Sequence, residues 1–334
     1  VDASRLGAYL DSQLGGVHET AVEKHVAGFS NETYFVYRAD DEYVLRRPPR
    51  GPILPTAHDV EREHRFLAAL HGTVARVPRP VVLCTDRDVI GAPFYLMERK
   101  RGHVIRAEMP AAFPSAADRR TVAFEMVDAL AELHSVDWRE TGLTGKAEGF
   151  LDRQLKRWRG QSELTVGKVR DLPGLPEITS WLTENQPGEG PSTVVHGDYK
   201  IDNVMFAPEW PPRLIAIFDW EMATVGDPLA DLGWLLHTWG KPPGWLEGDD
   251  PLPLTALRGF PSRLELTERY GQKTGREMGN FTWYHAFALY KMLTILEGLY
   301  VHYKEGTASN PAAAEFETRV PRLVEQAHLV IAEG

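Results

Sequence analysis

Short apolar runs separated by turn residues fill much of the first hundred positions of this chain. Residues 22–29, 33–39 and 42–46 each have the length and composition of a β-strand. Turn residues at 28–31 and 40–41 separate them. This spacing predicts an antiparallel sheet built from hairpins.

The apolar spacing then changes to a helical period. The stretch HDVEREHRFLAALHG ends in a glycine and carries apolar residues on one helical face, at Val60, Phe66, Leu67 and Leu70. The run FYLMERKRG at 94–102 has the pattern of a last strand that leads into a connection. We expect residues 1–100 to form one unit, a helix plus an antiparallel sheet.

Helical periodicity dominates the rest of the chain. Ser115 and Asp118 form a capping-box pattern, and apolar residues follow in steps of three and four up to Leu133. The stretch 281–303 is aromatic on most sides, which predicts a buried helix. Residues 101–334 should therefore form a larger, mainly helical unit, so the fold class is α+β. Further helices are predicted at 149–165, 175–186, 228–240, 261–274, 280–303 and 311–332.

Composition agrees with two compact units. The chain has 334 residues, of which 43% are hydrophobic, enough for two cores. The single Cys84 excludes an intrachain disulfide and predicts a reducing, cytoplasmic location. No apolar run approaches the ~20 residues that span a bilayer, and the start VDASR lacks a signal-peptide pattern. The formal charge of −10 disfavours nucleic acid as a partner.

The segment 194–221 carries the densest group of candidate chemical residues. Asp198 and Asn203 lie five positions apart on an expected tight loop after Gly197, and Asp219 ends the apolar run 214–218. A hairpin would return Asp219 to the neighbourhood of Asn203. Carboxylate and amide oxygens suit Mg²⁺, and a further carboxylate could orient an attacking hydroxyl.

The pattern H-G-D-x-K-x-x-N, followed by a strand that ends in F-D, resembles the aminoglycoside phosphotransferase family, which has a bilobal protein-kinase-like fold. The resemblance implies that Asp198 is the catalytic carboxylate, that Asn203 and Asp219 are Mg²⁺ ligands, and that Lys200 contacts the γ-phosphate. Within GDPLADLGW at 226–234, it implies that Asp231 braces the catalytic loop. His196 is interpreted as a second brace. Asp202 and Glu221 are interpreted as solvated or capping residues, with a metal or substrate contact as the alternative for Glu221.

The resemblance also assigns a nucleotide site to the first unit. Ser30 and Asn31 belong to a tight turn that would approach the phosphates. Arg46 takes the place of the usual strand lysine, with Arg47 as the alternative, and Glu63 or Glu61 would pair with that cation. Backbone groups of residues 98–100, from Glu98 to Lys100, would bind adenine, and Met97 would pack behind it or serve as an ordinary core residue.

The phosphate acceptor is expected to be a small molecule. Only about eight residues separate Asp219 from Asp227, too few for the long segment with which protein kinases dock a peptide. The long connection 240–261 is interpreted as part of the acceptor pocket. From residue 241 onward, 12 acidic residues face 10 basic ones, which argues against a polycationic aminoglycoside.

Three sequences narrow the resemblance further. They are VLRRPP at 44–49, YLMER at 95–99 and the HGDYKIDNV motif. They are most similar to the kinase-like domain associated with acyl-CoA dehydrogenases in fatty-acid metabolism. That subgroup implies a hydroxylated acid or its acyl-CoA ester as the acceptor.

The sequence thus favours an ATP- and Mg²⁺-dependent phosphotransferase that acts on a small hydroxylated molecule. The alternative is a non-catalytic nucleotide-binding module with the same fold, suggested by Arg46 and the sparse glycine loop. Asp198, Asn203 and Asp219 are all present, which favours the enzyme.

Overall fold

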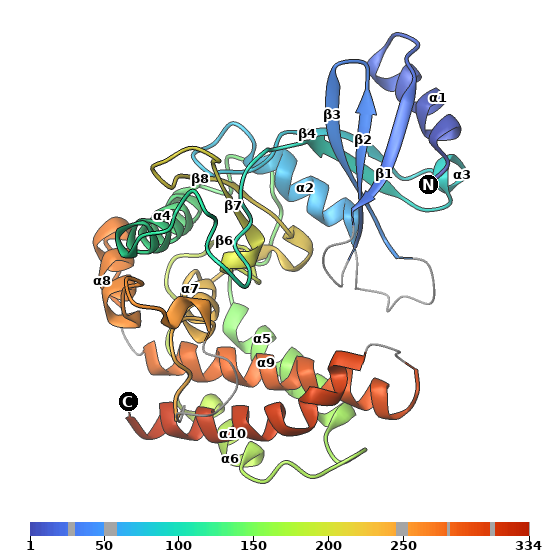
Figure 1. Cartoon of the computed structure of the whole chain (residues 1–334). Helices are drawn as coiled ribbons and strands as arrows, with labels where there is room; N and C mark the ends of the chain where they lie inside the picture. Colours follow the sequence, from blue (N-terminus) through green and yellow to red (C-terminus); the bar gives the residue numbers. More distant parts are fainter. Residues whose placement is uncertain (26–30, 50–58, 245–252, 279–280, 308–310, 334) are drawn as a thin grey trace.

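The computed structural model describes residues 1–25, 31–49, 59–244, 253–278, 281–307 and 311–333. It has two lobes, a small one built on an antiparallel sheet and a larger one that is mainly helical (Figure 1). The bilobal α+β architecture expected from the sequence is therefore confirmed. The chain passes from the sheet to the helical lobe after Glu98, where the last strand of the sheet ends.

The small lobe contains a five-stranded antiparallel sheet with the order β1-β2-β3-β5-β4. Its first three strands are the three predicted from the sequence. Apolar residues on one face of the sheet pack against α1, which the sequence pattern does not predict, through Leu6 and Leu10. The bounds of these elements are α1 Ala3–Leu14, β1 Thr20–His25, β2 Glu32–Arg38, β3 Asp41–Arg47, β4 Pro80–Cys84, α3 Arg87–Ile90 and β5 Phe94–Glu98.

Helix α2 (Val60–Leu70) belongs to the small lobe and contacts the larger one. Asp59 caps its N-terminus by accepting a hydrogen bond from the backbone N–H of Arg62. Its apolar face packs on β4 and β5, and it also contacts the short helix Trp220–Met222 of the other lobe, where Phe66 stacks on Trp220. α2 can therefore place side chains in the cleft between the lobes.

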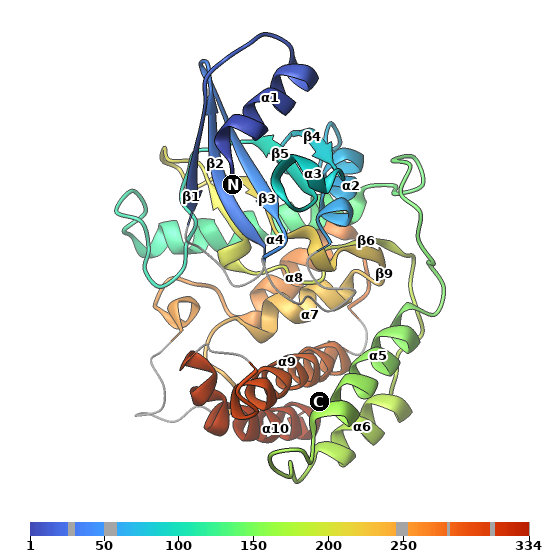
Figure 2. The same ribbon diagram turned by 90° about the vertical axis from the view of Figure 1, so that its right-hand side faces the viewer.

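The large lobe is organised around two buried helices. The first, α4, begins with the predicted capping box of Ser115 and Asp118. The second, α9, packs against α5, α7 and α10, and lies side by side with α10 (Figure 2). All the predicted helices are present, although α7 ends three residues early and a 3₁₀ turn, Pro311–Glu315, precedes the last helix. Their bounds are α4 Ala116–Ser135, α5 Phe150–Thr165, α6 Leu175–Glu184, α7 Leu229–His237, α8 Arg263–Thr274, α9 Phe281–Lys304 and α10 Phe316–Glu333.

Two small antiparallel sheets of two strands each lie where the lobes meet. β6 (Thr193–Val195) pairs with β9 (Thr224–Gly226), and β7 (Val204–Phe206) pairs with β8 (Leu214–Ile217). The second is the hairpin expected from the sequence. Both small sheets hold the segment 196–203 at the cleft, because this segment begins after β6 and ends where β7 starts. None of the described helices is long and apolar enough to cross a membrane.

Candidate active site

The loop between β6 and β7 is fixed by buried groups of the large lobe. The Asp231 carboxylate accepts hydrogen bonds from the backbone N–H groups of His196 (2.6 Å) and Gly197 (2.7 Å). Burial alone would raise the pKa of Asp231, but its hydrogen bond with His134 and the nearby His196 hold that pKa below its ordinary value. The His196 ring contacts the carbonyl of Phe218 at 2.7 Å. Asp231 and His196 therefore lie where braces of this loop were expected.

Gly197 gives this loop its sharp turn. Its φ of +84° lies in the left-handed region, and a Cβ added there would stand 2.7 Å from the carbonyl oxygen of Met222. The turn directs the next side chain, Asp198, toward Asn203, whose Nδ2 donates to Asp198 Oδ2 at 2.8 Å. The two residues that the sequence places five positions apart are thus in direct contact.

Three further contacts surround the Asp198 carboxylate. Trp234 Nε1 donates to Oδ1 at 2.8 Å, and the Lys200 ammonium lies 3.3 Å from Oδ2. Lys200 also pairs with Asp202 at 3.7 Å. The charges of Asp198 and Asp202 overcome the effect of burial and raise the pKa of Lys200, so Lys200 stays protonated beside the carboxylate.

Asp219 stands at the end of β8, where the expected hairpin returns it to Asn203. The backbone N–H of Phe218 donates to the carbonyl of Asn203 at 2.9 Å. Asn203 lines the cavity and donates to Asp198 through its Nδ2, so its Oδ1 is the side-chain atom that could bind a cation. Asp219 is in the left-handed region with φ 67° and projects into the same cleft. One amide oxygen and one carboxylate suit a hard divalent cation, so these residues fit Mg²⁺.

Glu221 lies closer to this site than its sequence interpretation suggests. Ligand atoms of Glu63, Asp219 and Glu221 all lie within 4.8 Å of one another, a group that could hold a cation. Burial, together with the charges of Asp219 and Glu63, raises the pKa of Glu221 to about 8. The alternative assignment of Glu221 as a metal contact therefore stays open.

Arg46, rather than Arg47, reaches the cleft from β3. Its guanidinium forms ion pairs with Glu63 at 3.0 Å and with Asp219 at 2.9 Å. Burial would lower the pKa of Arg46, but these carboxylates raise it above its ordinary value. Arg47 points elsewhere and donates to the carbonyl of Ile90. Arg46 thus links the small lobe to the Asp219 loop of the large lobe.

Glu63 has no exposed surface and is held from several sides. Besides Arg46, it accepts hydrogen bonds from the Tyr95 hydroxyl at 2.7 Å and from the Asn31 amide. Burial is the main influence on the carboxyl and raises its pKa. Glu61, the alternative partner, is exposed. Glu63 is therefore placed to hold Arg46 in position.

A cavity of about 520 Å³ lies between the lobes and brings most of the expected nucleotide residues together. Asn31, Arg46 and Asn203 are among its polar lining residues, and Ser30 lies outside the described residues. The guanidinium of Arg99 covers the Phe35 ring at 3.7 Å, a contact that the sequence did not predict. The apolar lining is Phe35, Val44, Met97, Val104, Met205 and Phe218.

Glu98, the first residue expected to contact adenine, is not among the described residues that line the cavity. Its backbone N–H donates to the Arg79 carbonyl at 2.9 Å, and its carboxylate accepts from the Arg79 N–H. Its carboxylate also pairs with Lys100. Met97, Arg99 and Lys100 line the cavity instead. An adenine contact from residues 98–100 would therefore use groups other than the backbone N–H of Glu98.

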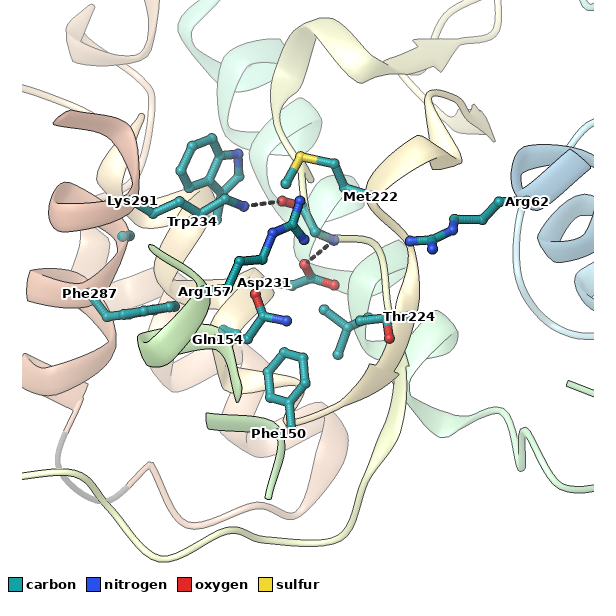
Figure 3. A pocket seen from close by; sticks show the side chains of 14 residues that line it. Arg62, Phe150, Gln154, Arg157, Met222, Thr224, Asp231, Trp234, Phe287 and Lys291 are labelled. Atoms are coloured by element: carbon teal, nitrogen blue, oxygen red, sulfur yellow. Dashed lines mark hydrogen bonds between the residues drawn. The ribbon is translucent and has the colours of Figure 1, made fainter. Parts of the chain in front are cut away.

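A second, smaller cavity of about 80 Å³ lies on the other side of the catalytic loop, between α5, α7, α9 and β9 (Figure 3). Trp234 and Lys291 line it, and Lys291 donates to the Gly197 carbonyl. No sequence pattern assigned a role to either residue, although Lys291 lies in the middle of a helix rich in aromatic residues. The connection 240–261 was predicted to form part of the acceptor pocket. Its described residues, 240–244 and 253–261, line neither this cavity nor the larger one.

Comparison with known proteins decides the family. The model of the phosphotransferase enzyme family matches residues 21–257, which run from β1 to the connection after α7 and include every residue of the catalytic loop. The chain belongs to this phosphotransferase family. Within this family, it is 32% identical to the crystal structure of a candidate aminoglycoside phosphotransferase from Ralstonia eutropha, with a TM-score of 0.84 over 99% of this chain and 98% of that one.

Curated relatives place this phosphotransferase beside larger proteins. It is 33% identical to chicken acyl-CoA dehydrogenase family member 11 over 92% of its own length, and 34% identical to mouse family member 10 over 93%. The chain spans 40% and 29% of those two proteins, respectively. Choline kinase from Cryptosporidium parvum shares the fold at a TM-score of 0.66, with 12% identity over 100% of this chain and 97% of that one.

Proposed function

We propose that this chain is an ATP- and Mg²⁺-dependent phosphotransferase that moves the γ-phosphate of ATP to a hydroxyl group of a small molecule. One observation carries the proposal. Asp198 contacts Asn203 directly, and Asn203 in turn stands beside Asp219, so the group that would orient a hydroxyl adjoins the groups that would hold the metal. Phosphoryl transfer needs these two functions a few ångströms apart.

Each residue has a distinct part in the proposed reaction. The Asp198 carboxylate accepts the proton of the acceptor hydroxyl while the hydroxyl oxygen bonds to the γ-phosphorus. The bond from that phosphorus to the β,γ-bridging oxygen breaks, and ADP leaves. Trp234 and Asn203 hold the carboxylate in one orientation.

The remaining charges act on the phosphates. Asn203 and Asp219 would hold Mg²⁺, which would neutralise phosphate charge, and Glu221 could be a further ligand. Arg46 is positioned by Glu63 to contact the phosphates, and Lys200 can contact the γ-phosphate from the catalytic loop. The cavity of about 520 Å³ is large enough for a nucleotide, and its apolar lining suits a purine ring.

The acceptor would enter from the side of the smaller cavity, because Gly197 and Trp234 border both that cavity and Asp198. Hydroxy acids and hydroxyacyl-CoA esters are the classes to test first, since the curated relatives are named as acyl-CoA dehydrogenase family members. An aminoglycoside acceptor is disfavoured, because Asp231 is the one acidic side chain among the residues described as lining that cavity.

A second function has one observation in its favour. Arg46 pairs with Asp219 at 2.9 Å, so the strand cation engages the carboxylate that would bind Mg²⁺. A non-catalytic nucleotide-binding module could keep this arrangement. Thermal melting with Mg²⁺-ATP, compared with ATP plus a chelator, reports binding in either case, since a ligand of the native state raises its stability.

Transfer itself separates the two functions. We expect mass spectrometry of metabolite extracts incubated with the protein and Mg²⁺-ATP to show a phosphorylated product that is missing with Asp198→Ala. Nucleotide binding with no product from extracts, hydroxy acids or hydroxyacyl-CoA esters would favour the non-catalytic module.

A further inference from the structure

Positive charge gathers around the smaller cavity from both lobes. Arg157 projects from α5 and Lys291 from α9, and Arg62 faces the cavity from α2 of the small lobe (Figure 3). The one lining carboxylate, Asp231, already accepts hydrogen bonds from the backbone of the catalytic loop. Among the described residues that line the cavity, three cations therefore face a single carboxylate, which is already engaged with the catalytic loop.

Lys291 is the most constrained of these cations. Its side chain is 7% exposed, its ammonium donates to the Gly197 carbonyl, and it lies 4.0 Å from the centre of the Trp234 ring. Within the described part of the chain, no carboxylate stands at ion-pair distance from it. A buried charge without a counter-ion costs free energy that a bound anion would recover.

The two arginines are also poorly neutralised. Arg157 lies over the Trp158 ring, with its centre 5.1 Å away, and makes no ion pair with any described residue. Loss of surrounding water and, secondly, the charge of Arg62 lower its pKa. Arg62 has only a long contact of 3.7 Å with Asp59, and its buried Nε lacks a hydrogen-bond partner among the described residues. The like charges of Arg157 and Arg62 would thus be relieved by an anion between them.

We propose that this cavity binds one anionic group of the acceptor, a carboxylate or a phosphate, held by Lys291 and Arg157 and approached by Arg62 from the small lobe. The inference rests on the proposed function, because the cavity is interpreted as the acceptor side of Asp198. A volume of about 80 Å³ accommodates a group of this size. Planar guanidinium groups are suited to both anions.

The position of Arg62 also implies that acceptor binding and nucleotide binding affect each other. Arg62 follows the N-cap of α2, and the next residue of that helix, Glu63, positions Arg46. An anion held by Arg62 and Arg157 together would draw α2 toward the large lobe. Acceptor binding would then favour the arrangement of α2 that supports nucleotide binding, so each ligand would raise the affinity for the other.

Matched compounds test the charge requirement. Short hydroxy acids are compared with their amides, and hydroxyalkyl phosphates with the corresponding diols, by kcat/KM with Mg²⁺-ATP. We expect at least one anionic class to exceed its neutral partner by roughly tenfold or more, as hydrogen bonds to charged groups allow. The class that does so distinguishes carboxylate from phosphate. Equal kcat/KM values within both pairs would overturn the inference and leave the phosphotransferase intact.

Variants test the residues. Arg157→Gln should raise KM for the anionic compound by about tenfold without changing KM for its neutral partner. Arg159→Gln, on the same helix and paired with Glu163 on the surface, is the matched control. Arg62→Gln should have the same selective effect, with the exposed Arg65→Gln as its control. Equal effects of Arg157→Gln on both compounds would contradict the assignment.

Binding separates this inference from the proposed reaction. Calorimetric titration of the anionic compounds and their neutral partners, with a non-hydrolysable ATP analogue present, needs no turnover. Binding of an anionic compound that Arg157→Gln weakens, without transfer by the wild type from ATP, would support the anion site and contradict the phosphotransferase. If neither anionic class binds more tightly than its neutral partner, the anion site is wrong.

Discussion

The indole Nε1–H of Trp234 donates to Oδ1 of Asp198 at 2.8 Å, although the two residues are 36 positions apart in the chain. Asn203 donates to the other oxygen, so the carboxylate is held from both ends. The ammonium of Lys291 lies over the face of the same indole. Trp234 therefore connects the proposed acceptor cavity to the proposed catalytic carboxylate.

Trp234→Phe should remove this hydrogen bond and keep most of the ring packing. We expect kcat to fall about tenfold, because a charge-assisted hydrogen bond that orients Asp198 is lost, while KM for ATP stays unchanged. Steady-state kinetics measure both constants. Trp210→Phe is the control, since Trp210 is 71% exposed and is not among the residues that line either cavity. An equal rise in KM for ATP would show that Trp234 supports the whole cleft rather than Asp198.

Arg46→Met should destabilise the protein and weaken nucleotide binding together. It leaves the fully buried Glu63 without its ion-pair partner, a loss that typically costs about 3–5 kcal/mol. Arg46→Lys keeps the charge, so we expect a smaller loss of stability and partial nucleotide binding. Urea unfolding and thermal melting with Mg²⁺-ATP measure the two effects. Stability equal to wild type in Arg46→Met would show that the Arg46–Glu63 pair contributes little.

Gly197→Ala should be far more harmful than another glycine substitution in the same lobe. The new Cβ would require a strained φ and would collide with the Met222 carbonyl, so we expect a loss of about 1–3 kcal/mol and a large fall in kcat. Gly160→Ala, within α5 and with nothing near the added Cβ, should instead stabilise the protein by about 0.5–1 kcal/mol. Chemical unfolding measures the change in the free energy of unfolding in both variants. Similar changes in the two variants would contradict this prediction.

Lys291 should give the stability of the protein a distinct pH dependence. Burial lowers its pKa from 10.5 to about 8. Between these values, the unfolded chain holds a proton that the folded chain releases, so stability should rise with pH across this window. The shift corresponds to about 3 kcal/mol. Charged or titratable groups act on Lys291 from the neighbouring elements: Asp198, Lys200, Asp231, His237 and Arg157.

A comparison with Lys291→Met isolates this contribution from the other groups. Urea unfolding at several pH values from 7 to 10.5 should show wild type gaining stability relative to the variant by an amount of that order. If the free energies of unfolding of wild type and Lys291→Met change equally with pH, Lys291 keeps its ordinary pKa in the folded protein.

The sequence predicted most local features because each depends on neighbours in the chain. The capping box of Ser115, the hairpin 204–217 and the turn at Gly197 are set by residues a few positions apart. α1 was missed, since its apolar face is narrow and becomes clear only where Leu6 and Leu10 meet the sheet. Local patterns therefore predicted the framework better than its packing.

The contacts that complete the candidate site join distant parts of the chain. Arg46 meets Asp219 across 173 positions, and Lys291 meets Gly197 across 94. No spacing rule predicts such pairs, because they depend on how the two lobes and α9 pack. The connection 240–261 was predicted to form part of the acceptor pocket, whereas most of the described residues that line the smaller cavity come from α5, α7 and α9.

The most direct test of the central claim is phosphoryl transfer by wild type and Asp198→Ala to the same acceptor, with nucleotide binding measured in parallel. The account predicts that both proteins bind Mg²⁺-ATP with similar affinity and that transfer by the variant falls by at least about a hundredfold, as expected when a reaction loses the group that positions its nucleophile. Transfer by Asp198→Ala at the wild-type rate would contradict the account.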